Sequence, residues 1–261
     1  MEMIILGCGG SAGVPMLGGP DGAGDWGECD PAEPRNRRTR SSVIISDGPG
    51  RTLLVDTGPD LRDQFLAQRV SVVDAVLYTH AHADHVGGLD ELRAINRIIE
   101  GPLPVYGTAE TLDEIAIRFD YAFRPWTPPR IFRPILDAHP LTLPCRHVMA
   151  GMSIHLFSQR HGRTETIGLR VGPMAYCTDV VELSDAALDT LRGVDTWVVD
   201  CFQRDDHLSH GWLDQVLYWR GIIQPRRTVL THMGPDMDWG WMQENLPAGV
   251  EAAYDGMRLY A

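Results

Sequence analysis

The stretch Thr79-His80-Ala81-His82-Ala83-Asp84-His85-Val86-Gly87-Gly88 decides how this chain is interpreted, because four of six consecutive positions carry metal-ligand side chains. They follow directly on residues 75–78, an apolar run typical of a buried strand. Neutral imidazoles and a carboxylate suit zinc, manganese or iron, and a turn at a strand end can point the first two ligands one way and the last two another. A solvated histidine-rich loop is the alternative, and the crowding of ligand types disfavours it.

Further ligands of such a site should also be His or Asp residues near the ends of apolar strands. Three residues meet this condition: Asp179 follows residues 175–178, His232 follows residues 229–231, and His161 follows residues 154–159. Each of the three, taken alone, would be interpreted as a cap or a surface residue. Together with the first cluster they become candidate ligands.

Short apolar or β-branched runs bounded by Gly, Pro or Asp predict many strands. They are residues 3–6, 42–45, 52–55, 75–78, 153–157, 167–171, 174–177, 196–199 and 228–230. Helical spacing follows Asp60 and Ser184, and a final hairpin is expected at Asp255-Gly256. Segments 18–40 and 119–140 are expected to be irregular. This mixture predicts an α/β protein in which two packed sheets are covered by helices, within one domain spanning residues 1–261.

The composition excludes several classes of protein. An apolar fraction of 44% is typical of globular chains, and no apolar run approaches the roughly 18 residues of a membrane span. The chain start lacks signal-peptide features, so we expect a cytoplasmic protein with no membrane partner. The five cysteines are scattered without a Cys-x-x-Cys pair, and Cys8, Cys177 and Cys201 are expected in the core.

The formal net charge of −12 argues against stable nucleic-acid binding, which depends on many Lys and Arg contacts to phosphate. A small anionic substrate remains compatible with this charge, because two bound divalent cations would reverse the local field. The sequence leaves the oligomeric state open, with a homodimer as one option.

The order of the candidate ligands resembles that of the metallo-β-lactamase-fold hydrolases, whose signature matches His80-x-His82-x-Asp84-His85. The resemblance implies a four-layer αββα sandwich and a site for two metal ions. It assigns His80, His82 and His161 to one metal, Asp84, His85 and His232 to the other, and Asp179 to a bridge between them.

Within this family the chain is most similar to the phosphoribosyl 1,2-cyclic phosphate phosphodiesterases of the carbon-phosphorus lyase pathway. The similarity covers residues 7–15, 199–201, 230–232 and 244–257 together with His210. Members of that group can carry a structural zinc on a cysteine cluster after the opening loop. Here only Cys29 remains in that stretch and Pro235 stands where a late histidine would be, so no structural zinc is expected.

The resemblance implies hydrolysis of a small cyclic ribose phosphate or nucleotide phosphodiester. Two divalent ions about 3.5–4 Å apart can activate a water as hydroxide and stabilise an in-line displacement at phosphorus. His210, which precedes a helical apolar stripe, is the expected acid for the leaving oxygen, and Asp84 is counted with it as catalytic. His207 is the competing histidine, and a simple helix cap is the alternative for His210.

Other residues are expected to support the site. Asp56 and Asp200 end apolar strands and are expected to orient ligand imidazoles. Arg35, Arg37, Arg38 and Arg40 form a basic cluster followed by Ser42, and Arg37, Arg38, Arg40, Ser42 and His210 are the candidate substrate-binding residues. A solvated face is the alternative for the arginines.

Three other functions remain open at this point. tRNA 3′-end processing is disfavoured by the negative charge and by the lack of a basic arm. Lactone, thioester or β-lactam hydrolysis uses similar ligands, although true β-lactamases often place a cysteine on the second metal. A non-enzymatic binding module is opposed by the complete ligand set.

Overall fold

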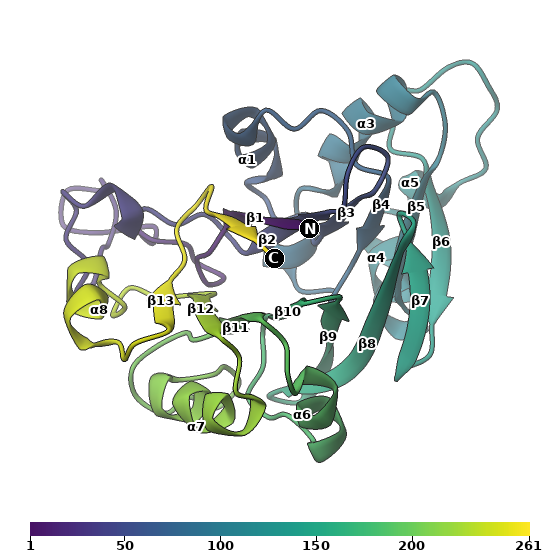
Figure 1. Ribbon diagram of the computed structural model, residues 1–261. Coiled ribbons are helices and arrows are strands. Elements are labelled where there is room, and N and C mark those ends of the chain that lie inside the picture. The colour runs from purple at the N-terminus through teal and green to yellow at the C-terminus, as the bar shows by residue number, and fades with distance from the viewer.

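Two seven-stranded β-sheets pack face to face in the computed structural model, which describes residues 1–261 (Figure 1). The first sheet contains, in spatial order, β14 (Arg258–Tyr260), β1 (Glu2–Gly7), β2 (Ser42–Ser46), β3 (Thr52–Val55), β4 (Ala75–Leu77), β5 (Leu103–Thr108) and β6 (Leu136–Leu141). The second contains β13 (Val250–Ala252), β12 (Arg227–Thr231), β11 (Thr196–Asp200), β10 (Met174–Cys177), β9 (Thr164–Val171), β8 (Met152–His161) and β7 (Cys145–Met149).

Helices cover the outer face of each sheet and complete four layers (Figure 1). Over the first sheet lie α1 (Leu61–Gln68), α3 (Leu92–Ile99), α4 (Ala109–Arg118) and α5 (Asp120–Phe123). Over the second lie α6 (Asp185–Leu191) and α7 (Leu213–Ile223), with α8 (Trp239–Asn245) beside β13. The short elements are α2 (Ala83–Val86), η1 (Pro34–Asn36) and η2 (Leu89–Glu91). The αββα sandwich expected from the sequence is confirmed.

Alternation of side chains along the first sheet explains why it needs cover on both faces. Met3 and Ile5 of β1 point into the core between the sheets, whereas Ile4 and Leu6 pack under the helices. Successive side chains of a strand point to opposite faces, so a strand that is apolar at every position must be buried on both sides. The continuous apolar runs of the sequence therefore specify inner strands of a layered protein.

Parallel pairing places several strand ends at one edge of the sandwich. In the first sheet β3, β4, β5 and β6 are parallel, and in the second β10, β11, β12 and β13 are parallel. The carboxyl ends of parallel strands meet at the same edge of a sheet. Residues that follow β3, β4, β10, β11 and β12 are thereby brought together, although they are far apart in the sequence.

The predicted strands and the helices after Asp60 and Ser184 are all present, but three predictions need correction. Asp255-Gly256 does not close a hairpin, because β13 belongs to the second sheet and β14 to the first, so this turn carries the chain from one sheet to the other. Segment 119–140 is only partly irregular, since it contains α5 and most of β6. Asp60 precedes α1 without capping it and pairs with Arg40 instead.

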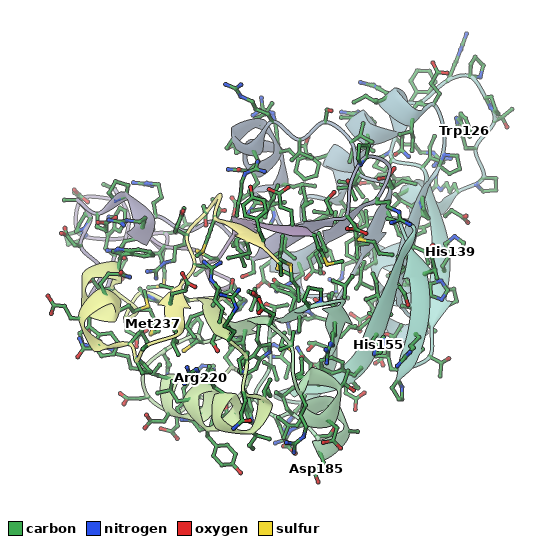
Figure 2. All side chains as sticks on the ribbon, in the orientation of Figure 1. Trp126, His139, His155, Asp185, Arg220 and Met237 are labelled. Carbon is green, nitrogen blue, oxygen red and sulfur yellow. The ribbon has the colours of Figure 1, made fainter.

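The remaining irregular part of segment 119–140 projects away from the sheets, with Trp126 near its tip (Figure 2). None of the helices combines the length and hydropathy that crossing a bilayer requires. The cysteines expected in the core, Cys8, Cys177 and Cys201, are fully buried.

Candidate metal centre

The seven candidate ligands converge at the edge where the parallel strands end. His80 follows β4, Asp179 follows β10, and His232 follows β12 directly. His161 is the last residue of β8 itself, not a residue after the strand as the sequence suggested. The ligand atoms form two groups, each lying within 4.8 Å of one another. The groups are His80, His82, His161 and Asp179, and Asp84, His85, Asp179 and His232.

The carboxylate of Asp179 belongs to both groups. Its Oδ1 lies 3.1 Å from Nε2 of His85 and 3.4 Å from Nε2 of His232. Its Oδ2 lies 3.7 Å from Nε2 of His161 and 3.8 Å from Nε2 of His80. Because each oxygen faces a different group of imidazoles, Asp179 has the geometry of a bridging ligand.

Buried nitrogen atoms without partners test whether this arrangement suits metal ions. Nε2 of His80, His85 and His232 are all buried and make no hydrogen bond within the chain. A buried polar atom without a partner costs about 1–3 kcal/mol, so such atoms rarely persist without a ligand. The residues present therefore fit two divalent cations with nitrogen and oxygen ligands.

The protonation states also suit cations at most of these positions. Burial lowers the pKa of His80 well below its usual value, and burial likewise lowers the pKa of His82 and His232, so their nitrogens are free at neutral pH. Burial opposes ionisation of Asp84, but the adjacent His85 outweighs it and lowers the pKa of Asp84 to about 2. His85 differs, because Asp179 and Asp56 outweigh its burial and raise its pKa. Those carboxylates would equally favour a cation at its Nε2.

Three residues that line the site have a left-handed backbone. Asp56, Asp179 and His232 have φ angles of 65°, 51° and 55°, and none of them is glycine. Such a conformation costs about 1–3 kcal/mol and clusters at functional sites, where the surrounding structure holds it in place. Each lies just beyond a strand, where the turn aims its side chain along the edge of the sandwich.

Thr79 and Asp56 contact the Nδ1 atoms of ligand imidazoles, one in each group. Asp56 Oδ2 lies 2.7 Å from Nδ1 of His85 and accepts a hydrogen bond from Thr79 Oγ1 at 2.7 Å. Thr79 Oγ1 lies 3.0 Å from Nδ1 of His80, and the main-chain oxygen of Ser209 lies 2.7 Å from Nδ1 of His161. These contacts direct Nε2 of each ring toward the ligand groups.

His210 lies between the last ligands of the two groups. Its ring centroid is 4.6 Å from that of His161 and 4.7 Å from that of His232. Nδ1 of His210 lies 2.9 Å from Asp200 Oδ2, so Nε2 is the nitrogen left for a substrate. Burial lowers the pKa of His210 and raises the pKa of Asp200 to about 7. The helix-cap alternative is wrong, because α7 starts at Leu213 with Trp212 as its N-cap.

Asp200 was expected to orient a metal-ligand imidazole, but its hydrogen-bonded imidazole is that of His210. The carboxylate also accepts a hydrogen bond from the main-chain nitrogen of Val180 at 3.0 Å. Nδ1 of His232 is 3.9 Å from Asp200 Oδ1, which is too long for a hydrogen bond.

The basic cluster does not form one phosphate clamp. Arg38 is 2% exposed and donates to the main-chain oxygens of Gly234 and Met237, and Ser42 Oγ donates to those of Val55 and Asp56. The structure thus places Arg38 and Ser42 in structural roles, which corrects their assignment to the substrate. Arg35 and Arg37 stack over Trp239 and Trp26, whereas Arg40 pairs with Asp60.

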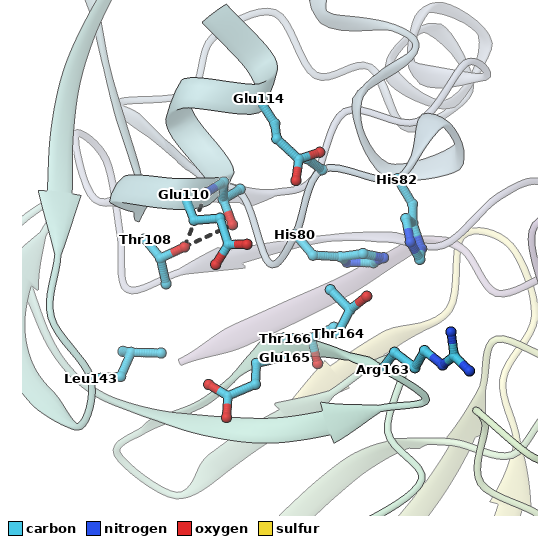
Figure 3. Close-up of a pocket in the computed structure, with 12 residues that line it drawn as sticks. His80, His82, Thr108, Glu110, Glu114, Leu143, Arg163, Thr164, Glu165 and Thr166 are labelled. Atoms are coloured by element: carbon cyan, nitrogen blue, oxygen red, sulfur yellow. Dashed lines mark hydrogen bonds between the residues drawn. The ribbon is translucent and has the colours of Figure 1, made fainter.

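A cavity of about 330 Å³ opens beside His80 and His82 (Figure 3). One wall comes from β5 and α4 and carries Glu110 and Glu114. The opposite wall comes from the β8–β9 turn and β9 and carries Arg163 and Glu165. These residues carry no recognisable signal in the sequence, because each is an ordinary charged residue and only the packing brings them to the ligands. Thr79 was also missed, although its position next to His80 was a usable signal.

Comparison with known proteins relates this geometry to a family. The family described as Beta-lactamase superfamily domain matches residues 51–233. An octanoyltransferase of Porphyromonas gingivalis is 32% identical over 259 residues, which cover 98% of this chain. The chain spans about half of that relative, 51% of its length.

Two solved structures are similar over the whole chain. A new diphosphatase from the PhnP family superposes with a TM-score of 0.88 at 32% identity, covering 100% of this chain and 97% of that chain. Zn(2+)-bound PqqB from Methylobacterium extorquens superposes with a TM-score of 0.79 at 20% identity, covering 100% of both chains. The second likeness concerns the fold alone.

Proposed function

Because this chain belongs to the beta-lactamase superfamily, we propose that it is a dinuclear metal-dependent phosphodiesterase. The proposed substrate is a small anionic phosphodiester, a cyclic ribose phosphate or a nucleotide phosphodiester. The proposed cofactors are two zinc, manganese or iron ions, which would supply a water of lowered pKa and positive charge beside the phosphoryl oxygens. The observation that carries the proposal is the pair of ligand groups joined by Asp179, with His210 against both of them.

The residues of this chain have distinct roles in the proposal. His80, His82 and His161 would hold one ion, Asp84, His85 and His232 the other, and Asp179 would bind both. Asp200 accepts a hydrogen bond from Nδ1 of His210 and leaves Nε2 directed at the substrate. The negative charge of a bound phosphate would favour the imidazolium form of His210, whose Nε2 proton then goes to the leaving oxygen. The similarity to a PhnP-family diphosphatase supports phosphorus chemistry at this site.

Transfer or hydrolysis of an acyl chain, as the octanoyltransferase relative suggests, fits this chain less well. Only Ala81 and Leu143 among the residues that line the cavity beside the ligands are apolar. An octanoyl chain would find little apolar surface to bury there. Because the chain covers half of that relative, the acyl activity need not lie in the matching half.

The proposal is tested by a substrate panel with protein loaded with manganese or zinc. The panel compares cyclic ribose phosphates, 2′,3′-cyclic nucleotides, pre-tRNA and lactones. Cleavage of the small phosphodiesters is expected, together with about two metal ions per chain and loss of activity after chelation. Lactone turnover without phosphodiesterase activity, or full activity after the metal is removed, would overturn the proposal.

The role of His210 is tested separately by replacing it with Ala. Turnover of a phosphodiester with an alkoxide leaving group should fall by about 10²–10⁴-fold, the usual contribution of general acid catalysis. A p-nitrophenyl diester should lose much less, because its leaving group departs without a proton. Equal losses on both substrates would remove His210 as the acid.

A further inference from the structure

The cavity beside His80 and His82 carries polar groups that the proposed chemistry does not use (Figure 3). Nε2 of His80 is buried and unpartnered, so the cavity adjoins the place where a phosphoryl group would lie under the proposed function. Apart from two apolar residues, the rest of the lining is carboxylate, hydroxyl and guanidinium. It consists of Thr108, Glu110, Thr111, Glu114, Arg163, Thr164, Glu165 and Thr166, with Ala81 and Leu143.

Most of these polar groups are already paired within the chain. Glu114 pairs with Arg118 at 2.9 Å, and Glu165 accepts a hydrogen bond from Ser158 Oγ at 2.7 Å. Thr166 Oγ1 donates to the main-chain oxygen of Asp179 at 3.0 Å. The exposed side chains of Glu110 and Arg163, in contrast, form no hydrogen bond or ion pair with the chain, and they come from different walls of the same cavity (Figure 3).

An unpaired acceptor and an unpaired donor that line the same cavity suit a hydroxylated ligand. A carboxylate only accepts hydrogen bonds and a guanidinium only donates them, whereas a hydroxyl group does both. A nucleobase would find no Phe, Tyr or Trp ring on which to stack, because the only rings in the lining are those of the candidate ligands His80 and His82. A second phosphate would meet three carboxylates, and the volume of about 330 Å³ is at the small end for ligand pockets.

We propose that Glu110 and Arg163 bind the hydroxyl groups of a small polyol substituent on the substrate, and so determine which phosphodiesters the protein accepts. This inference rests on the proposed function, since it places the substituent next to a phosphate at the candidate metal centre. Glu110 accepts from one hydroxyl group and Arg163 donates to another.

The test uses three p-nitrophenyl phosphodiesters with manganese-loaded protein, in which the second ester group is methyl, glyceryl or 5′-thymidyl. The shared leaving group makes the comparison independent of proton donation by His210. The glyceryl ester should have the highest kcat/KM. In Glu110→Ala the ratio of kcat/KM for the glyceryl and methyl esters should fall about tenfold, as expected for loss of a hydrogen bond to a charged group. Arg163→Ala should lower the same ratio.

Two further variants separate recognition from folding. Glu110→Gln retains an acceptor oxygen and should keep part of the ratio. Asp113→Asn changes an exposed charge of the same helix outside the cavity, and it should leave both the ratio and the basal rate unchanged. An unchanged ratio in Glu110→Ala and Arg163→Ala, or a preference for the thymidyl ester, would overturn the inference.

Calorimetry distinguishes failure of this inference from failure of the proposed function. Glycerol 3-phosphate should bind the manganese-loaded protein more tightly than methyl phosphate does, and Glu110→Ala should abolish the difference. A chain that cleaves none of the three esters refutes the phosphodiesterase, while the binding preference still decides the subsite. Equal affinity for the two monoesters in the unmodified protein would refute the subsite.

Discussion

Replacing Asp56 by Asn tests whether the hydrogen bonds that orient the ligand imidazoles control metal binding. The carboxylate of Asp56 is fully buried and accepts from Thr79 N at 2.8 Å, Thr79 Oγ1 at 2.7 Å and His85 Nδ1 at 2.7 Å. Asn can keep the first contact through its oxygen. Its amide nitrogen then faces the other two donors and cannot accept from either.

The expected loss of metal affinity in Asp56→Asn follows from where the Nδ1 proton of His85 can go. An unpaired buried N–H costs about 1–3 kcal/mol, and moving that proton to Nε2 would block the nitrogen that faces Asp84 and Asp179. Either outcome weakens a cation at this group. Loss of such a supporting contact typically costs 10–100-fold in metal affinity, about 1.4–2.7 kcal/mol, which agrees with the first figure.

Competition with a chromophoric chelator should resolve the two zinc affinities, starting from protein freed of metal. Asp56→Asn should weaken zinc mainly at the group that contains His85. Thr79→Val removes the hydroxyl that contacts both His80 Nδ1 and Asp56 Oδ2, so it should weaken zinc at both groups. Asp47→Asn, at an exposed ion pair with Arg51, is the matched control. Wild-type affinities in Asp56→Asn, with circular dichroism showing a folded chain, would refute the reasoning.

Three further predictions concern the scaffold. A Cβ on Gly58 would lie 2.7 Å from the main-chain oxygen of Asp84, so Gly58→Ala should displace the ligand segment and lower metal affinity. Gly221 lies in open space within α7, and Gly221→Ala should stabilise the chain by about 1 kcal/mol. Equal behaviour of the two variants in thermal unfolding and zinc titration would contradict this. Arg38→Lys should lower the free energy of unfolding in urea by about 2 kcal/mol, because carbonyl acceptors lose their donors; an unchanged midpoint would count against it. Burial raises the pKa of Asp255 to about 6, above its unfolded value of about 3.9, so ionisation destabilises the fold at higher pH. Relative to Asp255→Asn, the metal-free protein should therefore gain about 2 kcal/mol as pH falls from 6.5 to 4, and a flat difference would exclude this titration.

The sequence by itself determined the features that depend on neighbouring residues. Two-sided apolar runs specified the inner strands, because a strand buried on both faces needs an apolar residue at nearly every position. The cluster from His80 to His85 specified the ligand types, because its members are adjacent in the chain. Asp179 and His232 were recognisable because each follows an apolar strand.

Only the tertiary structure decided the features that depend on partners distant in the sequence. Arg38 and Ser42 were predicted to bind the substrate, but in the structure they are buried and donate hydrogen bonds to main-chain oxygens. The turn at Asp255-Gly256 has the local chemistry of a hairpin, yet the choice of sheet for each flanking strand depends on distant pairings. Glu110 of α4 and Arg163 of the β8–β9 turn line the same cavity only because the fold brings these two segments to the ligands. Such contacts join segments whose separation in the chain leaves no periodic signal, so they become visible only when the sheets are packed.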